Sequence, residues 1–265
     1  MYNLILSDFY KLWKSSAVKI VFLITAICAV MMSIITNFIA QGKLNISMAG
    51  IGFLFSDVNT KSILGAVIAG IFICGDFDNK TIHDAVSMGY SRAVIIVSKA
   101  VVFSLSILVI LLPYAIATCF DVFSGNKFNV GANSIGLLYI ITKYCGTVIA
   151  SGEVLKFIII MFTIMVVYAA QLSICIPVAF TLKKPVFVVA IYYVITIVFA
   201  QLPSIAGKYE IFDKICNLTP FGSNYCFLAL NTGTEALIKA IVVSLIFIII
   251  MMLITYSAFR KKEIK

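Results

Sequence analysis

The polar residues best suited to chemistry lie in one short stretch, residues 75 to 92, between two long apolar runs. This stretch holds the only histidine of the chain, His83, with three of its eleven acidic residues and two of its basic ones. A metal site for hydrolysis needs a cluster of ligands, which a single histidine does not provide. We therefore expect no catalytic residue and no metal in this chain, and we interpret the polar stretch as a contact surface.

The residue pattern of this stretch predicts a short helix that lies flat on a membrane surface. Its apolar residues approximate one helical face and its polar residues the other. Gly89 can end this helix, and Ser91 can cap the next one, with Arg92 at the lipid headgroups. The apolar residues are Phe77, Ile82, Ala85, Val86 and Met88, and the polar ones are Asp78, Asn79, Lys80, His83 and Asp84.

The composition of the chain indicates an all-α, multi-pass membrane protein. Hydrophobic residues make up 62% of the sequence and charged residues 12%, and the mean hydropathy is +1.12. Because a helix needs roughly 20 apolar residues to cross a bilayer, we expect six spans in a single domain of residues 1–265. They lie at residues 18–40, 63–74, 93–120, 154–180, 185–202 and 238–259. The second span is short, so we expect it to extend upstream through residues 56–61, whose polar atoms would lie near the far interface.

The distribution of lysine and arginine predicts the orientation. If the amino terminus is cytoplasmic, the cytoplasmic side carries twelve of the 20 basic residues, and both termini lie there. This bias and attraction to anionic membrane lipids account for the net charge of +9, so no nucleic-acid partner is required. The expected location is a bacterial cell membrane.

Two segments outside the spans are expected to lie at the membrane surfaces. Residues 2–16 are amphipathic and predict an interfacial helix on the cytoplasmic side. Residues 204–236 are too apolar for a solvated loop and predict short external helices that re-enter the membrane before the last span. A disulfide between Cys216 and Cys226 in that segment stays an open alternative.

Residues within the spans predict how the helices pack. Gly65, Ala66, Ala69 and Gly70 form a small-residue face suited to close contact, and packing inside the bundle is favoured over a seam between two copies. Gln171, in the fourth span, is a candidate for the cargo path. An amide in hydrocarbon more often bonds to a neighbouring helix than to a substrate.

The spans also indicate where the energy for any transport must come from. Their apolar cores contain no ionisable residue except at the edges, whereas ion-driven transporters use buried ionisable groups. The two Gly-Lys pairs, Gly42-Lys43 and Gly207-Lys208, lack the remainder of a phosphate-binding loop. We therefore expect no cofactor in this chain and no ATP hydrolysis by it.

Five features in order along the chain resemble the permease subunit of a type-2 ABC exporter. They are the amphipathic start with Lys11-Leu12-Trp13-Lys14-Ser15, six spans, a Gly-Asp-Phe-x-x-Lys-Thr entry at residues 75–81, Ser91-Arg92 with Lys99 beyond it, and Thr219-Pro220-Phe221-Gly222 before the last span. The resemblance covers essentially the whole chain. It implies that residues 75–90 are a cytoplasmic coupling helix that docks on a separate ABC ATPase subunit, which holds ATP and Mg.

The same resemblance implies a second permease copy, identical or related, and a set of residues at the ATPase contact. These residues are Asp76, Phe77, Lys80, Thr81, Ile82, His83, Asp84, Val86, Ser91 and Arg92. An apolar bundle favours apolar or amphipathic cargo, such as a peptide toxin, a bacteriocin or a lipid. The alternative is a membrane immunity or assembly factor that transports nothing and binds a cytoplasmic partner through residues 75–92.

Overall fold

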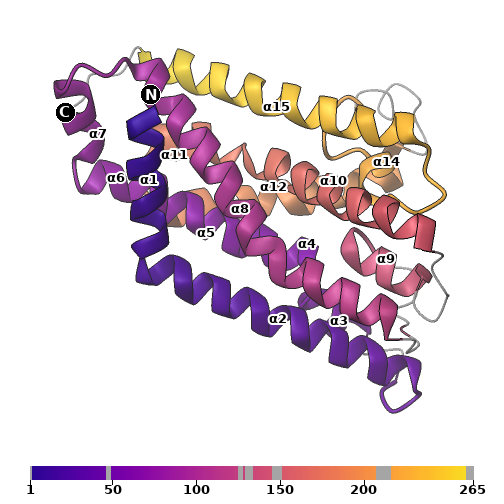
Figure 1. Cartoon of the computed structure of the whole chain (residues 1–265). Helices are drawn as coiled ribbons and strands as arrows, with labels where there is room; N and C mark the ends of the chain where they lie inside the picture. Colours follow the sequence, from indigo (N-terminus) through magenta and orange to yellow (C-terminus); the bar gives the residue numbers. More distant parts are fainter. Residues whose placement is uncertain are drawn as a thin grey trace.

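The computed structural model describes residues 2–45, 49–124, 128, 134–144, 151–206 and 216–260. Within these ranges the chain is helical and contains no strand. Long helices run side by side along one direction of the molecule (Figure 1). Five segments are long and apolar enough to cross a membrane: Ser16–Ala40, Gly50–Asp78, Arg92–Phe123, Val154–Leu182 and Thr234–Arg260. These features fit a multi-pass membrane protein.

The chain begins with two helices that meet at a sharp angle (Figure 1). Helix α1 (Tyr2–Lys14) is amphipathic, as the sequence predicts, and buries Asp8 and Leu12. Ser15 is in an extended conformation and separates α1 from α2 (Ser16–Ala40). Helices α1 and α2 both pack against α8, so α1 is attached to the side of the bundle.

The second apolar segment is built from several short helical pieces. After α3 (Ala49–Leu54), Ser56 caps α4 (Asp57–Thr60) by accepting a hydrogen bond from the Asn59 amide. Two π-helical turns, Lys61–Gly65 and Gly70–Cys74, flank α5 (Ala66–Ala69). Such turns are rare and often occur at functional sites. The segment continues directly into α6 (Gly75–Asp78).

Close packing inside the bundle explains the small residues of this segment. A Cβ atom on Gly65 would lie 2.6 Å from Leu172 Cδ1, and one on Gly70 would lie 2.9 Å from Pro185 Cβ. The predicted packing of this face within the bundle is therefore confirmed at both glycines. Side chains larger than hydrogen would push apart helices that now touch.

The remaining long helices complete the bundle. Helix α8 (Arg92–Phe123) lies against α2, α10 and α15. Helices α10 (Val154–Leu172) and α11 (Cys175–Leu182) follow each other with a short break and pack on α15 (Thr234–Arg260). Helix α12 (Pro185–Ala206) contacts α5; it is apolar over Pro185–Phe199 but is not among the five span-length segments.

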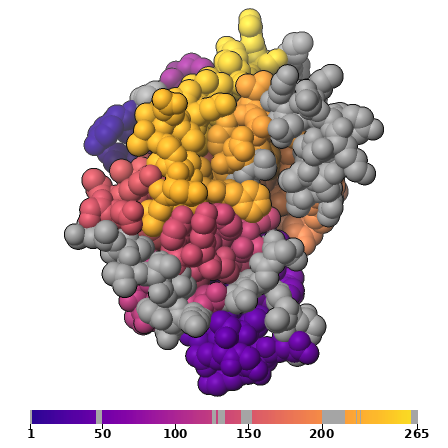
Figure 2. All heavy atoms as spheres, turned by 90° about the vertical axis from the view of Figure 1, so that its right-hand side faces the viewer, coloured from indigo at the N-terminus to yellow at the C-terminus, as the bar shows by residue number. Residues whose placement is uncertain are grey.

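Short elements gather at the end of the molecule opposite α1. Helix α9 (Leu137–Tyr144) buries Leu137, Leu138, Ile140 and Ile141, and a 3₁₀ turn at Ser151–Glu153 leads into α10. Figure 2 looks at this end of the molecule, where α9 lies between the end of α2 and the start of α15. Helix α9 therefore closes this end with apolar side chains.

The structure describes part of the external segment that the sequence predicts at 204–236. Residues 207–215 lie outside the described ranges. From residue 216 on, the chain forms α14 (Ser223–Cys226) and buries Tyr225, Leu228 and Ala229. This part contains one short helix, and its apolar side chains are partly buried against the bundle. Cys216 is a free thiol, and the side chain of Cys226 is outside the described residues.

Candidate functional site

The polar stretch lies at the end of the bundle where α1 and the end of α15 also lie (Figure 1). It forms two short helices rather than the single flat helix expected from the sequence. Helix α6 prolongs the second apolar segment, and α7 (Thr81–Ser87) follows after a turn at Asn79 and Lys80. Lys80 adopts a left-handed conformation with φ of 58°, which breaks the helix.

The exit from α7 agrees with the sequence prediction. Gly89 has a φ of +87°, a conformation that favours glycine, and its amide donates to the Val86 carbonyl. Ser91 then caps α8, because its hydroxyl accepts a hydrogen bond from the Val94 amide at 3.4 Å. The two predicted roles, a helix stop at Gly89 and a cap at Ser91, are confirmed.

A cluster of four ionised side chains joins α1, α6 and α8. The Lys99 ammonium donates to Asp8 Oδ1 at 2.5 Å and also pairs with Asp76. Asp76 in turn pairs with Lys11 of α1, and the Ser98 hydroxyl donates to Asp8 Oδ2 at 2.9 Å. We refer to Asp8, Lys11, Asp76 and Lys99 as the charged cluster.

Burial makes the charged cluster a strong connection between these helices. Asp76 is 1% exposed, Lys99 4% and Asp8 6%. A buried charge is tolerated only when it is paired and hydrogen-bonded, because losing water costs several kcal/mol per ion. The three helices must therefore keep their relative positions for all four charges to stay paired.

Lys11 shows the effect of this environment on protonation. Its side chain is the most exposed of the cluster, at 45%. Partial burial lowers the pKa of Lys11, and the positive charge of Lys99 lowers it further, while Asp8 opposes these effects. The ammonium also lies 3.4 Å from the Thr81 hydroxyl, at the first residue of α7, so Lys11 links α1 to both short helices.

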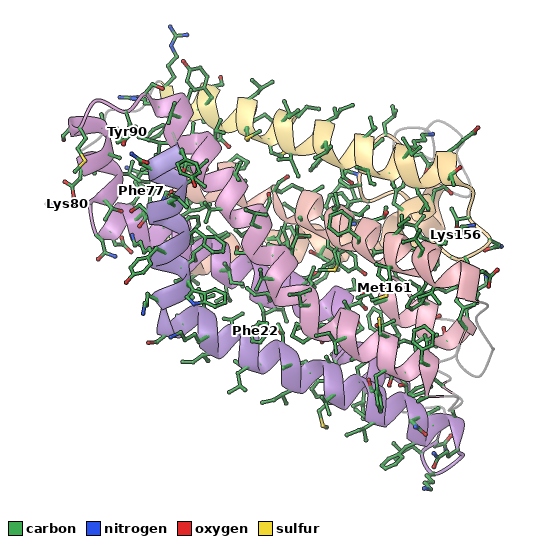
Figure 3. The ribbon with its side chains drawn as sticks, in the orientation of Figure 1. Phe22, Phe77, Lys80, Tyr90, Lys156 and Met161 are labelled. Atoms are coloured by element: carbon green, nitrogen blue, oxygen red, sulfur yellow. The ribbon has the colours of Figure 1, made fainter. Side chains whose placement is uncertain are left out.

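Aromatic packing joins α6 to α11 and α15 at the same end of the bundle. The Phe77 ring meets Phe180 of α11 at 5.4 Å and Phe259 of α15 at 6.3 Å, both edge to face. Lys183, in the turn after α11, lies over the Phe77 ring at 5.0 Å. Such pairs add to the free energy gained by burying the rings. Phe77 therefore anchors α6 within the chain (Figure 3).

Arg92 connects the start of α8 to the end of α15. Its guanidinium donates to the Phe259 carbonyl at 2.7 Å and to the Arg260 carbonyl at 3.0 Å. These carbonyls belong to the last turn of α15, where helices lack internal partners and favour cations. Arg92 therefore acts as a cap for α15 in this chain.

No protein-family model and no curated protein matches this sequence. What the chain does must therefore be argued from its own residues. The features that bear on function are the charged cluster, the surface that α6 and α7 leave exposed, and a polar network in the bundle.

The residues predicted for a partner contact divide into two groups. Asp76, Phe77 and Ile82 are buried within the chain, at 1%, 8% and 1% exposure. The expected apolar contact face of Phe77, Ile82 and Val86 is therefore not a surface in this conformation, because Phe77 and Ile82 pack inward and only Val86 is half-buried. Lys80 and Asp84 are exposed, Thr81, His83, Val86 and Arg92 are half-buried, and Ser91 is exposed.

A second polar network lies inside the bundle near α9. The Tyr168 hydroxyl donates to Asp57 Oδ2 at 2.5 Å, and the Leu137 amide donates to the same oxygen at 2.9 Å. Lys61 donates to Gln171, and the Gln171 amide donates to the Pro220 carbonyl at 2.7 Å. Gln171 thus bonds across helices, which was the favoured interpretation of this residue.

The polar atoms expected near the far interface lie in this network, where protein encloses them. Asp57 is 0% exposed and Lys61 5% exposed, and the Lys61 ammonium lies 3.3 Å from the centre of the Tyr168 ring. Both residues are therefore enclosed by α9, α10 and the residues before α14. Both positions precede the apolar core expected at residues 63–74, so they add buried charges at the edge of that span.

Sequence reasoning missed the charged cluster and this network for the same reason. Each pair joins residues that are far apart along the chain: Lys99 and Asp8 are separated by 91 positions and Tyr168 and Asp57 by 111. One signal was present, because a charged residue close to an apolar run must find a partner when the run is buried. Asp8, Asp57, Lys61 and Lys99 all satisfy that description.

Proposed function

We propose that this chain is the membrane permease subunit of an ATP-driven exporter. In this proposal the bundle has six spans, with α12 as the fifth, and both termini are cytoplasmic. The end that carries α1, α6 and α7 then faces the cytoplasm, as the lysine and arginine bias favours. A separate ABC ATPase subunit, which binds ATP and Mg, docks there, and a second permease copy completes the transporter.

The observation that carries this proposal is the construction of residues 75–91. The stretch is anchored inside the bundle by Asp76 and Phe77, and it exposes Lys80, Asp84 and Met88 on its outer side. A segment that merely connected two spans would not require a buried carboxylate paired with two other helices, α1 and α8. A segment that transmits movement does, because force on its outer side must reach the helices behind it.

The charged cluster defines the route of that movement. A push on α7 acts on α1 through Thr81 and Lys11, and on α8 through Asp76 and Lys99. Since the pair of Asp76 and Lys99 is buried and charged, separating it costs more than moving the helices together. Closure of the ATPase would therefore move α1, the second segment and α8 as one body.

The exposed faces of the spans support a proposal for the class of cargo. Exposed side chains on α2, α8, α12 and α15 are almost all aliphatic or aromatic. A solute with strong hydration would lose its water along such surfaces without compensation. We therefore propose a peptide toxin, a bacteriocin or a lipid as cargo.

The test uses the outer side of α7. Met88, which is 76% exposed, is changed to aspartate in one variant and Asp84 to lysine in another, and the matched control is Lys184→Asp on the turn before α12. Each full-length variant is expressed in its native host at equal membrane abundance, and any ABC ATPase that co-purifies with it is identified. We expect the α7 variants to weaken co-purification of the ATPase and ATP-dependent export, and the control to leave both unchanged.

Two results would count against this proposal. If no ABC ATPase co-purifies with the intact chain, the chain is not an exporter subunit. If an unrelated cytoplasmic protein is captured through α7 and no export is measured, the chain is an immunity or assembly factor. Retention of ATPase binding and export in both α7 variants would remove the assigned role of this surface.

A further inference from the structure

A groove at the junction of α1, α2 and α8 lies outside the features considered so far. Its volume is about 390 Å³, and its wall is formed by apolar side chains such as Leu12, Trp13, Phe22 and Val109. This volume falls in the range of pockets that hold small ligands. Phe22 marks the α2 side of the groove in Figure 3.

The groove has one charged side chain, Lys19, in the first turn of α2. None of the side chains that line the groove is acidic, and the two nearest acidic groups of α1 and α6, Asp8 and Asp76, are already paired within the charged cluster. The ammonium of Lys19 is exposed at the rim. The site therefore combines a long apolar wall with a cation at one end.

We propose that this groove binds an anionic phospholipid, with an acyl chain along the wall and the phosphate at Lys19. The position favours a lipid because α1 is amphipathic and Trp13 is 64% exposed beside the groove, as is typical of side chains at a membrane interface. An anionic headgroup fits because a basic residue near a membrane surface attracts anionic lipid. The bound lipid fills the space between α1 and α8 and so supports the position of α1.

The lipid has a specific structural consequence for the charged cluster. Leu12 lines the groove, while Lys11 on the adjacent position of α1 pairs with Asp76. A lipid that holds α1 against α8 also holds Asp8 beside Lys99, because Asp8 lies on α1 and Lys99 lies on α8. The proposed site is independent of any ATPase, since none of its residues lies on α7.

The chain carries its own reporter for this test. Trp13 is the only tryptophan in the sequence, and it lines the groove. The full chain is placed in phosphatidylcholine vesicles that contain a fixed small fraction of phosphatidylglycerol. Bromine atoms are attached to the acyl chains of either lipid in turn, and quenching of Trp13 fluorescence measures which lipid lies beside the groove.

The expected result is preferential quenching by the anionic lipid. Per mole of brominated lipid, phosphatidylglycerol should show about five-fold higher association than phosphatidylcholine, the factor expected for one basic residue at an anionic surface. Lys19→Gln should bring this ratio close to one, and Lys184→Gln, a basic residue near the same end of the bundle, should leave it unchanged. Val109→Phe, which fills the groove, should also lower the ratio, whereas Val101→Phe on the exposed side of α8 should not.

Three results would overturn the inference. Equal quenching by the two lipids in the unmodified chain means that the groove does not select an anionic headgroup. A preference that survives Lys19→Gln reports general surface attraction rather than this site. Absence of quenching by either lipid means that protein, such as a second copy of the chain, covers the groove.

Discussion

Removal of Lys99 is the sharpest test of the charged cluster. In Lys99→Leu, the carboxylates of Asp8 and Asp76 remain buried, and only Lys11 is left to pair with them. Removing one partner of a buried ion pair costs about 3 to 5 kcal/mol, because the remaining charge has no compensation. The leucine side chain fills much of the space of the lysine stem, so loss of charge dominates the effect.

The measurement is thermal unfolding of the purified chain in a mild detergent. For a protein of this size, each kcal/mol shifts the Tm by about 2 to 4 °C, so Lys99→Leu should lower the Tm by roughly 6 to 20 °C. The matched control is Lys14→Leu, an exposed residue at the end of the same α1 that carries Lys11. A change at an exposed position of this kind should stay within about 0.5 kcal/mol.

A double-mutant cycle separates the ion pair from the effect of packing. Asp8→Leu combined with Lys99→Leu removes one acid and one base together and leaves the pair of Lys11 and Asp76. The double variant should be more stable than the sum of the single effects predicts, by about 1 to 3 kcal/mol. If the two effects simply add, and Lys99→Leu costs no more than Lys14→Leu, the cluster does not stabilise the junction and the reasoning fails.

Two further predictions concern contacts elsewhere in the bundle. Gly70→Ala should destabilise the chain by about 1 to 3 kcal/mol in the same unfolding assay, because the new methyl would press against Pro185. The control is Gly75→Ala, whose new methyl meets no atom within 4 Å and which should be neutral or stabilising by up to about 1 kcal/mol. Equal effects of the two changes would contradict the packing argument. Asp57→Ala should speed hydrogen exchange at the Leu137 amide, because the acceptor of that amide is lost. The same change should lower the free energy of unfolding by about 1 to 3 kcal/mol. Unchanged exchange at Leu137 would show that other contacts hold α9.

Local sequence patterns predicted the parts of the fold that depend on neighbouring residues. The cap at Ser91, the stop at Gly89 and the amphipathic α1 each follow from a few adjacent positions, and all three occur in the structure. The length and hydropathy of the apolar runs likewise predicted spans, and five segments meet those criteria.

The features that the sequence did not predict depend on contacts between distant residues. Helical spacing placed Phe77 on the apolar face of a surface helix, and the resemblance placed it at a partner contact, but its ring packs against Phe180 and Phe259. Periodicity predicts which residues share a face of a helix, but it does not predict which other segments pack against that face. The same limit applies to Asp57 and Lys61, whose partners come from α9 and α10 and are visible only once the chain is folded.

The composition of the charged cluster has an electrical consequence. It contains two carboxylates and two ammonium groups, so its total charge is zero. Moving one elementary charge through a membrane potential of 100 mV takes about 2.3 kcal/mol of electrical work. A neutral cluster adds no net charge to a displacement of α1, α6 and α8, so the cluster itself contributes no such work. Loss of Lys99 would leave a net negative group that does contribute.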